Sequence, residues 1–331
     1  MTTRYVDPAA AGADDGTSWT DAWTTLQSAA DTAVAGDVVY CRGTETLSAA
    51  IDFDTNSGSA ASGFIKFIGC NAGGSVDGTR FVLDGNSAAT NCILLAAQKY
   101  IWWENLELKN ATGAGWDATN ANWGCCAFVN CYSHDNSGRG FDAYYCNDGV
   151  VFIRCRAIDN GSDGFFDTYY STTRFALCYS AGNSGAGFAV EGGVAGQLFV
   201  GCVCHNNTDK GIDAEGGINA IHCVLDENGA DGIIQDTNDY LGLVLGCRIT
   251  GNGDAAGEYG LDVSAGRVLY GWNFLVNNNS GAANGYVDAI PDDADADTNE
   301  TSGTEGYTDG ANDDFNLTDS ATLRSTAIEL N

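Results

Sequence analysis

The fold of this chain is decided by a short segment, CYSHDNSGRGF at residues 131–141, that recurs along the middle of the sequence. Its frame is a cysteine, an asparagine five residues later and a glycine four residues after that, followed by Phe or Ile. The frame starts at Cys131, Cys155, Cys178, Cys202 and Cys223, so its steps are 24, 23, 24 and 21 residues. A short step kept this regularly is typical of a solenoid, in which each repeat is one coil stacked on the last.

Stacking the frame predicts two ladders of side chains. We expect buried thiols that act as small apolar fillers at Cys131, Cys155, Cys178, Cys202, Cys223 and Cys247. We expect amides stacked at one left-handed bend at Asn136, Asn160, Asn183, Asn207, Asn228 and Asn252. The repeated glycine is expected at a second bend that needs positive φ.

The residues around each cysteine alternate in polarity, as short strands do. Because Arg154 and Arg156 must face water, we expect Val151, Ile153 and Cys155 to face inward. A coil of 21–25 residues with two or three short strands has the step of a parallel β-helix, in which coils lie ~4.8 Å apart. We therefore predict an all-β, single-domain parallel β-helix of about ten coils.

The ends of the chain differ from the repeats. We predict that residues 1–36 form a cap with an amphipathic helix, because apolar residues recur at helical spacing between residues 19 and 33. Ser18 and Asp21 form a capping-box-like start, and Gly36 is a natural stop. Residues 37–290 are assigned to the β-helix, and residues 291–331 to an acidic loop and a C-terminal cap.

The N-terminal residues also carry a family resemblance. They are Tyr5-Val6-Asp7-Pro8, Gly16-Thr17-Ser18-Trp19, Ala22-Trp23, Leu26, Ala29, Gly36-Asp37-Val38-Val39 and Gly43. This run resembles the start of right-handed parallel β-helix proteins of the pectin-lyase-like superfamily. The resemblance, over about residues 4–290, implies the fold and its right hand. It leaves function open, because that superfamily includes polysaccharide lyases and hydrolases as well as phage spike and fibre proteins.

Composition excludes some partners. The chain holds 44 acidic and 14 basic residues, a formal net charge of −30, which disfavours nucleic acid and anionic membranes. No apolar run approaches the length of a membrane span. The first residues show no signal peptide. We expect cytoplasmic synthesis and a final place in a virion or outside the cell, with a removed signal sequence as the alternative.

Known catalytic sets of this superfamily are not intact here. Lyases that resemble pectate lyase use an Asp cluster that holds Ca²⁺ and an Arg or Lys base. Hydrolases that resemble polygalacturonase carry Asn-Thr-Asp, Asp-Asp, Gly-His-Gly and Arg-Ile-Lys. This chain has Asn207-Thr208-Asp209, but Asn207 belongs to the predicted ladder, and Gly-His-Gly and Arg-Ile-Lys are missing. The sequence therefore favours a protein that is not an enzyme.

One surface nevertheless combines carboxylates, tyrosines and arginines. We expect Asp142 and Asp167 at nearly one position of neighbouring coils, ~5 Å apart, close to the separation in retaining glycosidases. A sugar-binding groove or a protein interface would use Tyr144, Tyr145, Tyr169, Tyr170, Arg139, Arg154 and Arg174. The plainer alternative is that the tyrosines pack an outer strand and the arginines offset nearby acids.

The acidic tail offers the one cofactor candidate. Asp293, Asp295 and Asp297 alternate in a loop, an arrangement that can gather Ca²⁺, and a solvated acidic linker is the alternative. No other cofactor is expected.

These observations favour a virion structural or adhesive protein, such as a phage spike, fibre or capsid decoration. The alternative is a polysaccharide lyase or glycoside hydrolase that acts on an acidic glycan. The expected partners are other virion proteins or further copies of the chain, a trimer being one open arrangement, with a cell-surface glycan as a further candidate.

Overall fold

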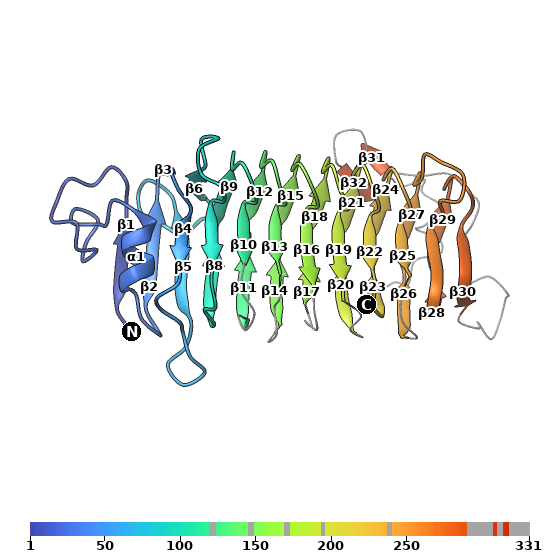
Figure 1. The fold of residues 1–331 in the computed structure, drawn as a ribbon, viewed down its shortest axis with the longest axis horizontal. Helices are drawn as coiled ribbons and strands as arrows, with labels where there is room; N and C mark the ends of the chain where they lie inside the picture. The colour runs from blue at the N-terminus through green and yellow to red at the C-terminus, as the bar shows by residue number, and fades with distance from the viewer. Residues whose placement is uncertain are drawn as a thin grey trace. The chain divides into compact units, whose positions relative to one another are not determined.

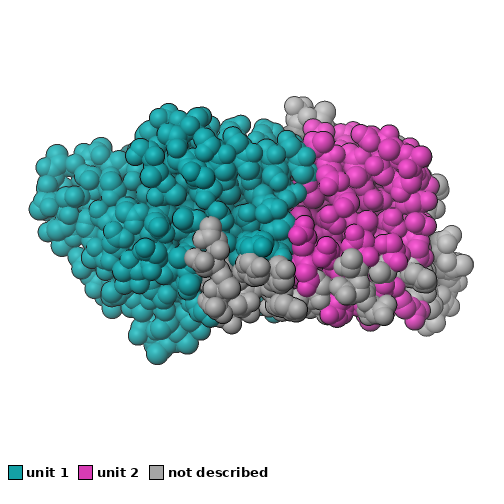
Figure 2. Space-filling view, viewed as in Figure 1, with its two compact units in different colours: residues 1–185 teal, residues 186–331 magenta. Residues whose placement is uncertain are grey.

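The computed structural model describes residues 1–118, 124–144, 149–168, 173–192, 196–236, 240–289, 307–309 and 314–317. The chain divides into two compact units, Met1–Gly185 and Ala186–Asn331, called unit 1 and unit 2 (Figure 2). Within each unit, strands of successive coils lie side by side in parallel columns (Figure 1).

Unit 1 begins with a helix and strands and continues as regular coils. Its elements are β1 (Thr3–Val6), α1 (Leu26–Thr32), β2 (Val38–Arg42), β3 (Thr44–Thr46), β4 (Ile51–Phe53), β5 (Ile65–Cys70), β6 (Phe81–Asp84), β7 (Ile93–Leu95), β8 (Ile101–Glu104), β9 (Leu106–Lys109), β10 (Trp116–Ala118), β11 (Cys126–Val129), β12 (Tyr132–His134), β13 (Phe141–Ala143), β14 (Val150–Ile153), β15 (Arg156–Ile158), β16 (Phe165–Thr168), β17 (Arg174–Ala176) and β18 (Tyr179–Ala181).

These strands form three parallel columns. The first column is β4-β7-β10-β13-β16. The second is β1-β2-β5-β8-β11-β14-β17. The third is β3-β6-β9-β12-β15-β18. Each coil thus contributes one strand to each column, which is the arrangement of a parallel β-helix.

Unit 2 repeats the pattern. Its elements are β19 (Phe188–Glu191), β20 (Gln197–Val200), β21 (Val203–His205), β22 (Ile212–Ala214), β23 (Ile218–Ile221), β24 (Val224–Asp226), β25 (Ile233–Gln235), β26 (Leu241–Leu245), β27 (Arg248–Thr250), β28 (Leu261–Gly271), β29 (Phe274–Val276), β30 (Ala283–Ala289), β31 (Tyr307–Asp309) and β32 (Asp314–Leu317). The long β28 pairs with both β25 and β26, so it serves two columns. Strands β31 and β32 form a separate antiparallel pair.

The predicted β-helix is therefore confirmed. In the described parts of the chain the third column of unit 1 has six strands, and the corresponding strands of unit 2, β21, β24, β27 and β29, number four, in line with about ten coils. No helix in these parts is long and apolar enough to cross a membrane.

The predicted inward direction of the side chains was wrong for the strand that precedes Cys155. Phe152 is 1% exposed and faces the core, whereas Val151 and Ile153 are half-buried. The cause is a bend at Arg154, where φ is 53°. A residue with left-handed backbone conformation between β14 and β15 interrupts the alternation of side chains. Even-numbered residues therefore face inward in β14 and odd-numbered residues in β15.

The bend lets aromatic rings fill the core of unit 1. Phe152 stacks on Phe128 at 4.6 Å and on Phe175 at 5.3 Å between ring centroids. Phe141 and Phe165 stack on each other at 5.0 Å and meet Phe152 edge-on. Stacked and edge-to-face pairs at these distances add ~0.5–1.5 kcal/mol each to the burial of the rings.

The cysteine and asparagine ladders occupy fixed places in every coil. All six ladder cysteines are buried free thiols. The Asn136 side-chain amide donates to Asn160 Oδ1 at 3.0 Å, and the Asn160 amide donates to Asn183 Oδ1 at 2.9 Å. In unit 2 the ladder runs through Asn207, Asn228 and Asn252, with bonds of 2.9 Å.

The left-handed bend lies one residue before the position we expected. Asp135 and Asp159, which precede the ladder asparagines, have φ of 54° and 53°, whereas Asn136 and Asn160 do not have positive φ. The short acidic side chains tolerate this conformation, as Asn and Asp commonly do. The ladder asparagines are instead selected for their hydrogen bonds.

The repeated glycine is also needed for a different reason. Gly140 and Gly211 do not have positive φ. A Cβ at either position would lie 2.5 Å from a carbonyl oxygen of the next coil, that of Gly164 or Gly232. Glycine is therefore required because the coils approach closely at this point.

The N-terminal helix is shorter than the spacing suggested. Helix α1 begins at Leu26, with Thr25 as its N-cap, and packs against β4 and β1. The Glu45 carboxylate accepts from the Leu26 backbone N–H at 2.8 Å. Ser18 and Asp21 do bond reciprocally, at 2.9 and 3.1 Å, but they close a turn that is not continued as a helix.

Candidate functional site

The outer face of the first column in unit 1 carries two aligned carboxylates. Asp117 on β10 and Asp142 on β13 are paired in register, between inward-facing neighbours. Because neighbouring coils are ~4.8 Å apart, the two side chains leave the sheet about 5 Å from each other. We call Asp117, Asp142 and Arg139 the carboxylate site.

Burial and a like charge act on Asp117. They raise its pKa from 3.8 to about 6, burial being the larger cause and Asp142 the second. The side-chain amide of Asn91 donates to Asp117 Oδ2 at 2.8 Å and acts in the opposite direction. Asp117 is therefore a carboxyl group that can hold a proton close to neutral pH.

Asp142 lies in a different environment. Burial raises its pKa, and the adjacent Arg139 opposes that rise. Arg139 Nη1 donates to Asp142 Oδ2 at 2.9 Å. Asp142 Oδ1 is buried and accepts no hydrogen bond from the described residues. Arg139 thus holds the Asp142 carboxylate in place through one of its two oxygens.

Arg139 is fixed by three neighbours. Besides Asp142, its Nε donates to Asp163 Oδ2 at 3.1 Å. Its guanidinium carbon lies 3.2 Å from the ring centroid of Phe166, which takes the outward position of the next coil. A guanidinium held by two carboxylates and a ring remains charged and ordered. It supplies a fixed positive charge beside the pair.

The expected pairing of Asp142 with Asp167 was wrong. The register aligns Asp142 with Phe166, and Asp167 with the inward-facing Ala143. Asp167 is 1% exposed, so it belongs to the interior. The segment from residue 165 has one more residue before its Asp than the segment from residue 141, and one residue of offset moves a side chain to the other face of a strand.

The tyrosines and arginines of the predicted surface do not gather at one place. Tyr144 lies over Phe166 at 6.5 Å, beside the carboxylate site. Arg154 is exposed at the bend that follows β14. Arg174 lines a separate hollow of about 450 Å³, together with Trp102 and other residues. Tyr145, Tyr169, Tyr170 and the calcium candidates Asp293, Asp295 and Asp297 lie outside the described residues.

Sequence reasoning missed Asp117. The frame has no cysteine copy that leads into β10, so this coil was not aligned with the next. The signal was present, because Trp116-Asp117-Ala118 has the same apolar–Asp–Ala pattern as Phe141-Asp142-Ala143.

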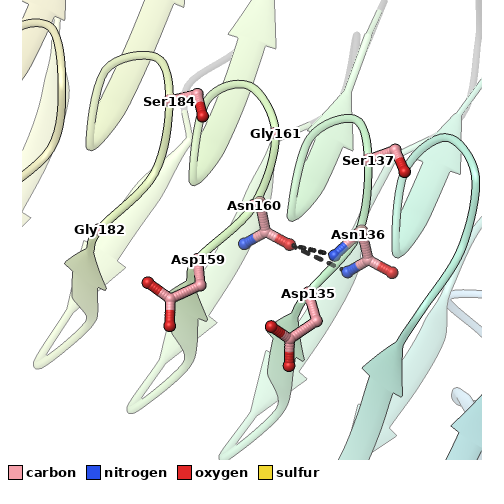
Figure 3. Close-up of a pocket in the computed structure, with 8 residues that line it drawn as sticks. All are labelled: Asp135, Asn136, Ser137, Asp159, Asn160, Gly161, Gly182 and Ser184. Atoms are coloured by element: carbon pink, nitrogen blue, oxygen red, sulfur yellow. Dashed lines mark hydrogen bonds between the residues drawn. The ribbon is translucent and has the colours of Figure 1, made fainter.

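A second polar feature lies at the ladder bends of unit 1. A shallow hollow of about 330 Å³ is lined by Asp135, Asp159, Ser137 and Ser184, beside the ladder asparagines. Figure 3 shows Asp135 and Asp159 on neighbouring coils, both on the same side of the ladder. The hollow is shallow and open, whereas the carboxylate site holds two half-buried carboxylates beside an arginine, so the carboxylate site is the better candidate for catalysis.

The geometry defines a parallel β-helix with a carboxylate pair on its outer face, and comparison with known proteins agrees with the fold. The profile of the family described as right handed beta helix region matches residues 66–239. The chain belongs to this family. No curated protein matches the sequence as a relative.

Solved structures with a similar fold include three lyases. Pectate lyase Pel9A is 18% identical, with 97% of this chain and 90% of that chain covered and a TM-score of 0.70. An alginate lyase from Paenibacillus sp. str. FPU-7 is 14% identical, with coverage of 80% and 96% and a TM-score of 0.48. A rhamnogalacturonan lyase is 16% identical, with coverage of 91% and 87% and a TM-score of 0.47.

The expectation of a virion structural protein was wrong. Pectate lyase Pel9A, whose fold matches over 97% of this chain, is not a spike, fibre or capsid protein. The phage resemblance rested on the N-terminal run, whose residues contribute to β1, α1 and β2 and carry no information about function.

Proposed function

We propose that the protein is an enzyme that cleaves the glycosidic bonds of a polysaccharide at the carboxylate site. The observation that carries this proposal is the pair Asp117 and Asp142, which are in register on neighbouring coils and have unlike environments. Two carboxyl groups about 5 Å apart, one protonated and one ionised, are what retaining glycoside hydrolysis requires. The fold shared with pectate lyase Pel9A over 97% of the chain supports the class of substrate.

The two side chains take separate roles in this proposal. A carboxylate oxygen of Asp142 attacks the anomeric carbon, and the bond from that carbon to the leaving oxygen breaks. Asp117 gives its proton to that oxygen, a role that fits its pKa of about 6. Water then attacks the glycosyl ester on Asp142 while Asp117 takes a proton from the water, which restores both carboxyl groups.

Arg139 and Phe166 position the reacting groups. Arg139 holds Asp142 Oδ2, so the carboxylate is fixed in one orientation. The half-buried Tyr144 lies over the buried Phe166 beside the pair, and its ring suits the apolar face of a sugar.

A second reaction, β-elimination at a uronic acid, is favoured by the likeness to a pectate lyase. In that case the positive charge of Arg139 would face the uronate carboxylate. Since Arg139 already bonds two carboxylates, it is less suited to abstract a proton, and hydrolysis is the better fit.

Product analysis with a panel of polysaccharides tests the proposal. Pectate heads the panel, and neutral glucans and xylans complete it. We expect new reducing ends without unsaturated sugars, whereas unsaturated ends would favour elimination. The double variant Asp117→Asn, Asp142→Asn should release neither product. Failure of the wild-type chain to cleave any member, or undiminished cleavage by the double variant, would refute the proposal.

A further inference from the structure

Unit 2 brings three metal-ligating side chains together, apart from the carboxylate site. His205 ends β21 and Asp226 ends β24, and the two residues are paired in register. Glu227 follows Asp226 directly. One ligand atom of each lies within 4.8 Å of the others, and no other group of three His, Cys, Asp or Glu residues in the described ranges is as close.

The Asp226 carboxylate is oriented toward His205. Thr250, aligned with Asp226 on the next coil, donates its hydroxyl to Asp226 Oδ1. Asp226 Oδ2 lies 3.7 Å from His205 Nδ1. That separation is long for a hydrogen bond, but two ligands of one tetrahedral zinc ion lie roughly 3.4 Å apart at bond lengths of about 2.0–2.2 Å. Thr250 thus acts as an outer-shell partner that aims the carboxylate.

Glu227 has a backbone conformation that glutamate rarely adopts. Its φ is 50°, in the left-handed region. The equivalent bends of other coils carry residues that suit this conformation, namely Asp135, Asp159, Gly182, Asn206 and Gly251. Glutamate is not favoured there by conformation, and a residue that violates local preference commonly has a functional reason. Its carboxylate lies within 4.8 Å of a ligand atom of His205.

We propose that His205, Asp226 and Glu227 bind a divalent transition-metal ion, with zinc as the best match. One imidazole nitrogen and two carboxylate oxygens suit zinc, whereas Ca²⁺ prefers oxygen ligands alone. The Glu227 side chain is exposed, so it can move its carboxylate to bonding distance from the metal ion. The fourth coordination position of the ion is then left for water. The site is independent of polysaccharide cleavage and does not rest on that proposal.

Isothermal titration of the metal-free full-length chain with zinc chloride tests the proposal. We expect one equivalent to bind, with no comparable binding of Ca²⁺. His205→Asn and Glu227→Gln should weaken zinc binding, and Thr250→Val should weaken it about 10–100-fold, the usual effect of removing an outer-shell partner. Glu227 is exposed, so its variant should fold even if a buried substitution does not. Thermal unfolding of each variant without metal checks that the fold is retained.

The matched control is His222→Asn, the same substitution at a histidine of unit 2 that lies at a left-handed bend. It should bind zinc as the wild-type chain does. Absorption of the Co²⁺-substituted protein should show nitrogen and oxygen ligation without a thiolate band, which separates this site from the many thiols. No zinc binding, undiminished binding by His205→Asn, or equal loss in His222→Asn would overturn the proposal.

Discussion

Removal of one rung of the asparagine ladder, by Asn160→Ala, should cost a large part of the stability of unit 1. Asn160 is 1% exposed. Its amide nitrogen donates to Asn183 Oδ1 at 2.9 Å and to the Ser133 carbonyl at 3.2 Å, and its oxygen accepts from Asn136 at 3.0 Å. The same oxygen also accepts from the Asn136 backbone N–H at 3.4 Å. Four buried hydrogen bonds at ~1 kcal/mol each give a loss of about 3–4 kcal/mol in the free energy of unfolding.

Urea unfolding followed by tryptophan fluorescence measures this loss. Six of the seven tryptophans belong to unit 1, so the signal reports the unit that contains Asn160. The control is Asn284→Ala, at an exposed asparagine outside the ladder, which should change stability by less than ~0.5 kcal/mol. A loss below ~1 kcal/mol for Asn160→Ala would show that the ladder does not stabilise the coils.

A second substitution at the same rung separates hydrogen bonding from packing. Asn160→Asp keeps the size of the side chain but sets an oxygen against Asn183 Oδ1. At neutral pH we expect a loss at least as large as that of Asn160→Ala. A protonated carboxyl can donate to Asn183, so part of the stability should return as the pH falls. Equal stability at all pH values would contradict the hydrogen-bond explanation.

Three further predictions concern the core, the carboxylate site and the thiols. Phe152→Ala should lower the free energy of unfolding by ~3–5 kcal/mol. The control Leu177→Ala, at a residue that is 53% exposed, should have little effect. Similar losses of stability in the two variants would contradict the assignment of Phe152 to the core. The pKa of Asp117 is about 6 in the folded protein against an ordinary 3.8. Between pH 3.8 and about 6 the folded state therefore binds more protons than the unfolded state, and the contribution of Asp117 to stability falls as the pH rises. Asp117→Asn should therefore flatten the dependence of stability on pH between about 4 and 6, and an unchanged slope would refute the shift. Among the cysteines of the described ranges, alkylation of the native protein, mapped by mass spectrometry, should modify Cys125 before the eleven buried ones. Early labelling of the ladder thiols would contradict their burial.

Much of the fold could be predicted because it repeats. The regular step of the cysteine–asparagine–glycine frame predicts one coil per copy and places the amides on one line. The sequence could not show the bend at Arg154, since Arg has no preference for a left-handed conformation, and the inward face of β14 was therefore assigned wrongly. The close approach at Gly140 depends on the next coil and is equally invisible in one copy.

The site was harder to predict because it depends on register. The sequence pointed to Asp142 and Arg139, which do lie at the carboxylate site. It paired Asp142 with Asp167, because both follow the ladder glycine, although the extra Phe in that segment turns Asp167 inward. The true partner, Asp117, comes from a coil whose copy of the frame is degraded. The known catalytic motifs each lie in one segment, whereas the carboxylate site combines residues of two coils.

The central claim is that Asp117 and Asp142 cleave a polysaccharide, and initial rates of cleavage by single variants test it most directly. The matched control is Asp213→Asn, in the equivalent position of unit 2. Lys210 donates to the Asp213 carboxylate at 2.7 Å, as Arg139 does to Asp142. The residues aligned with Asp213 on the neighbouring strands are Ala189 and Ile234, so Asp213 has no carboxylate partner in register. We predict that Asp117→Asn and Asp142→Asn each lower kcat about 10²- to 10⁴-fold, while Asp213→Asn retains the wild-type rate. Wild-type rates in both unit 1 variants, or an equal loss in Asp213→Asn, would contradict the account.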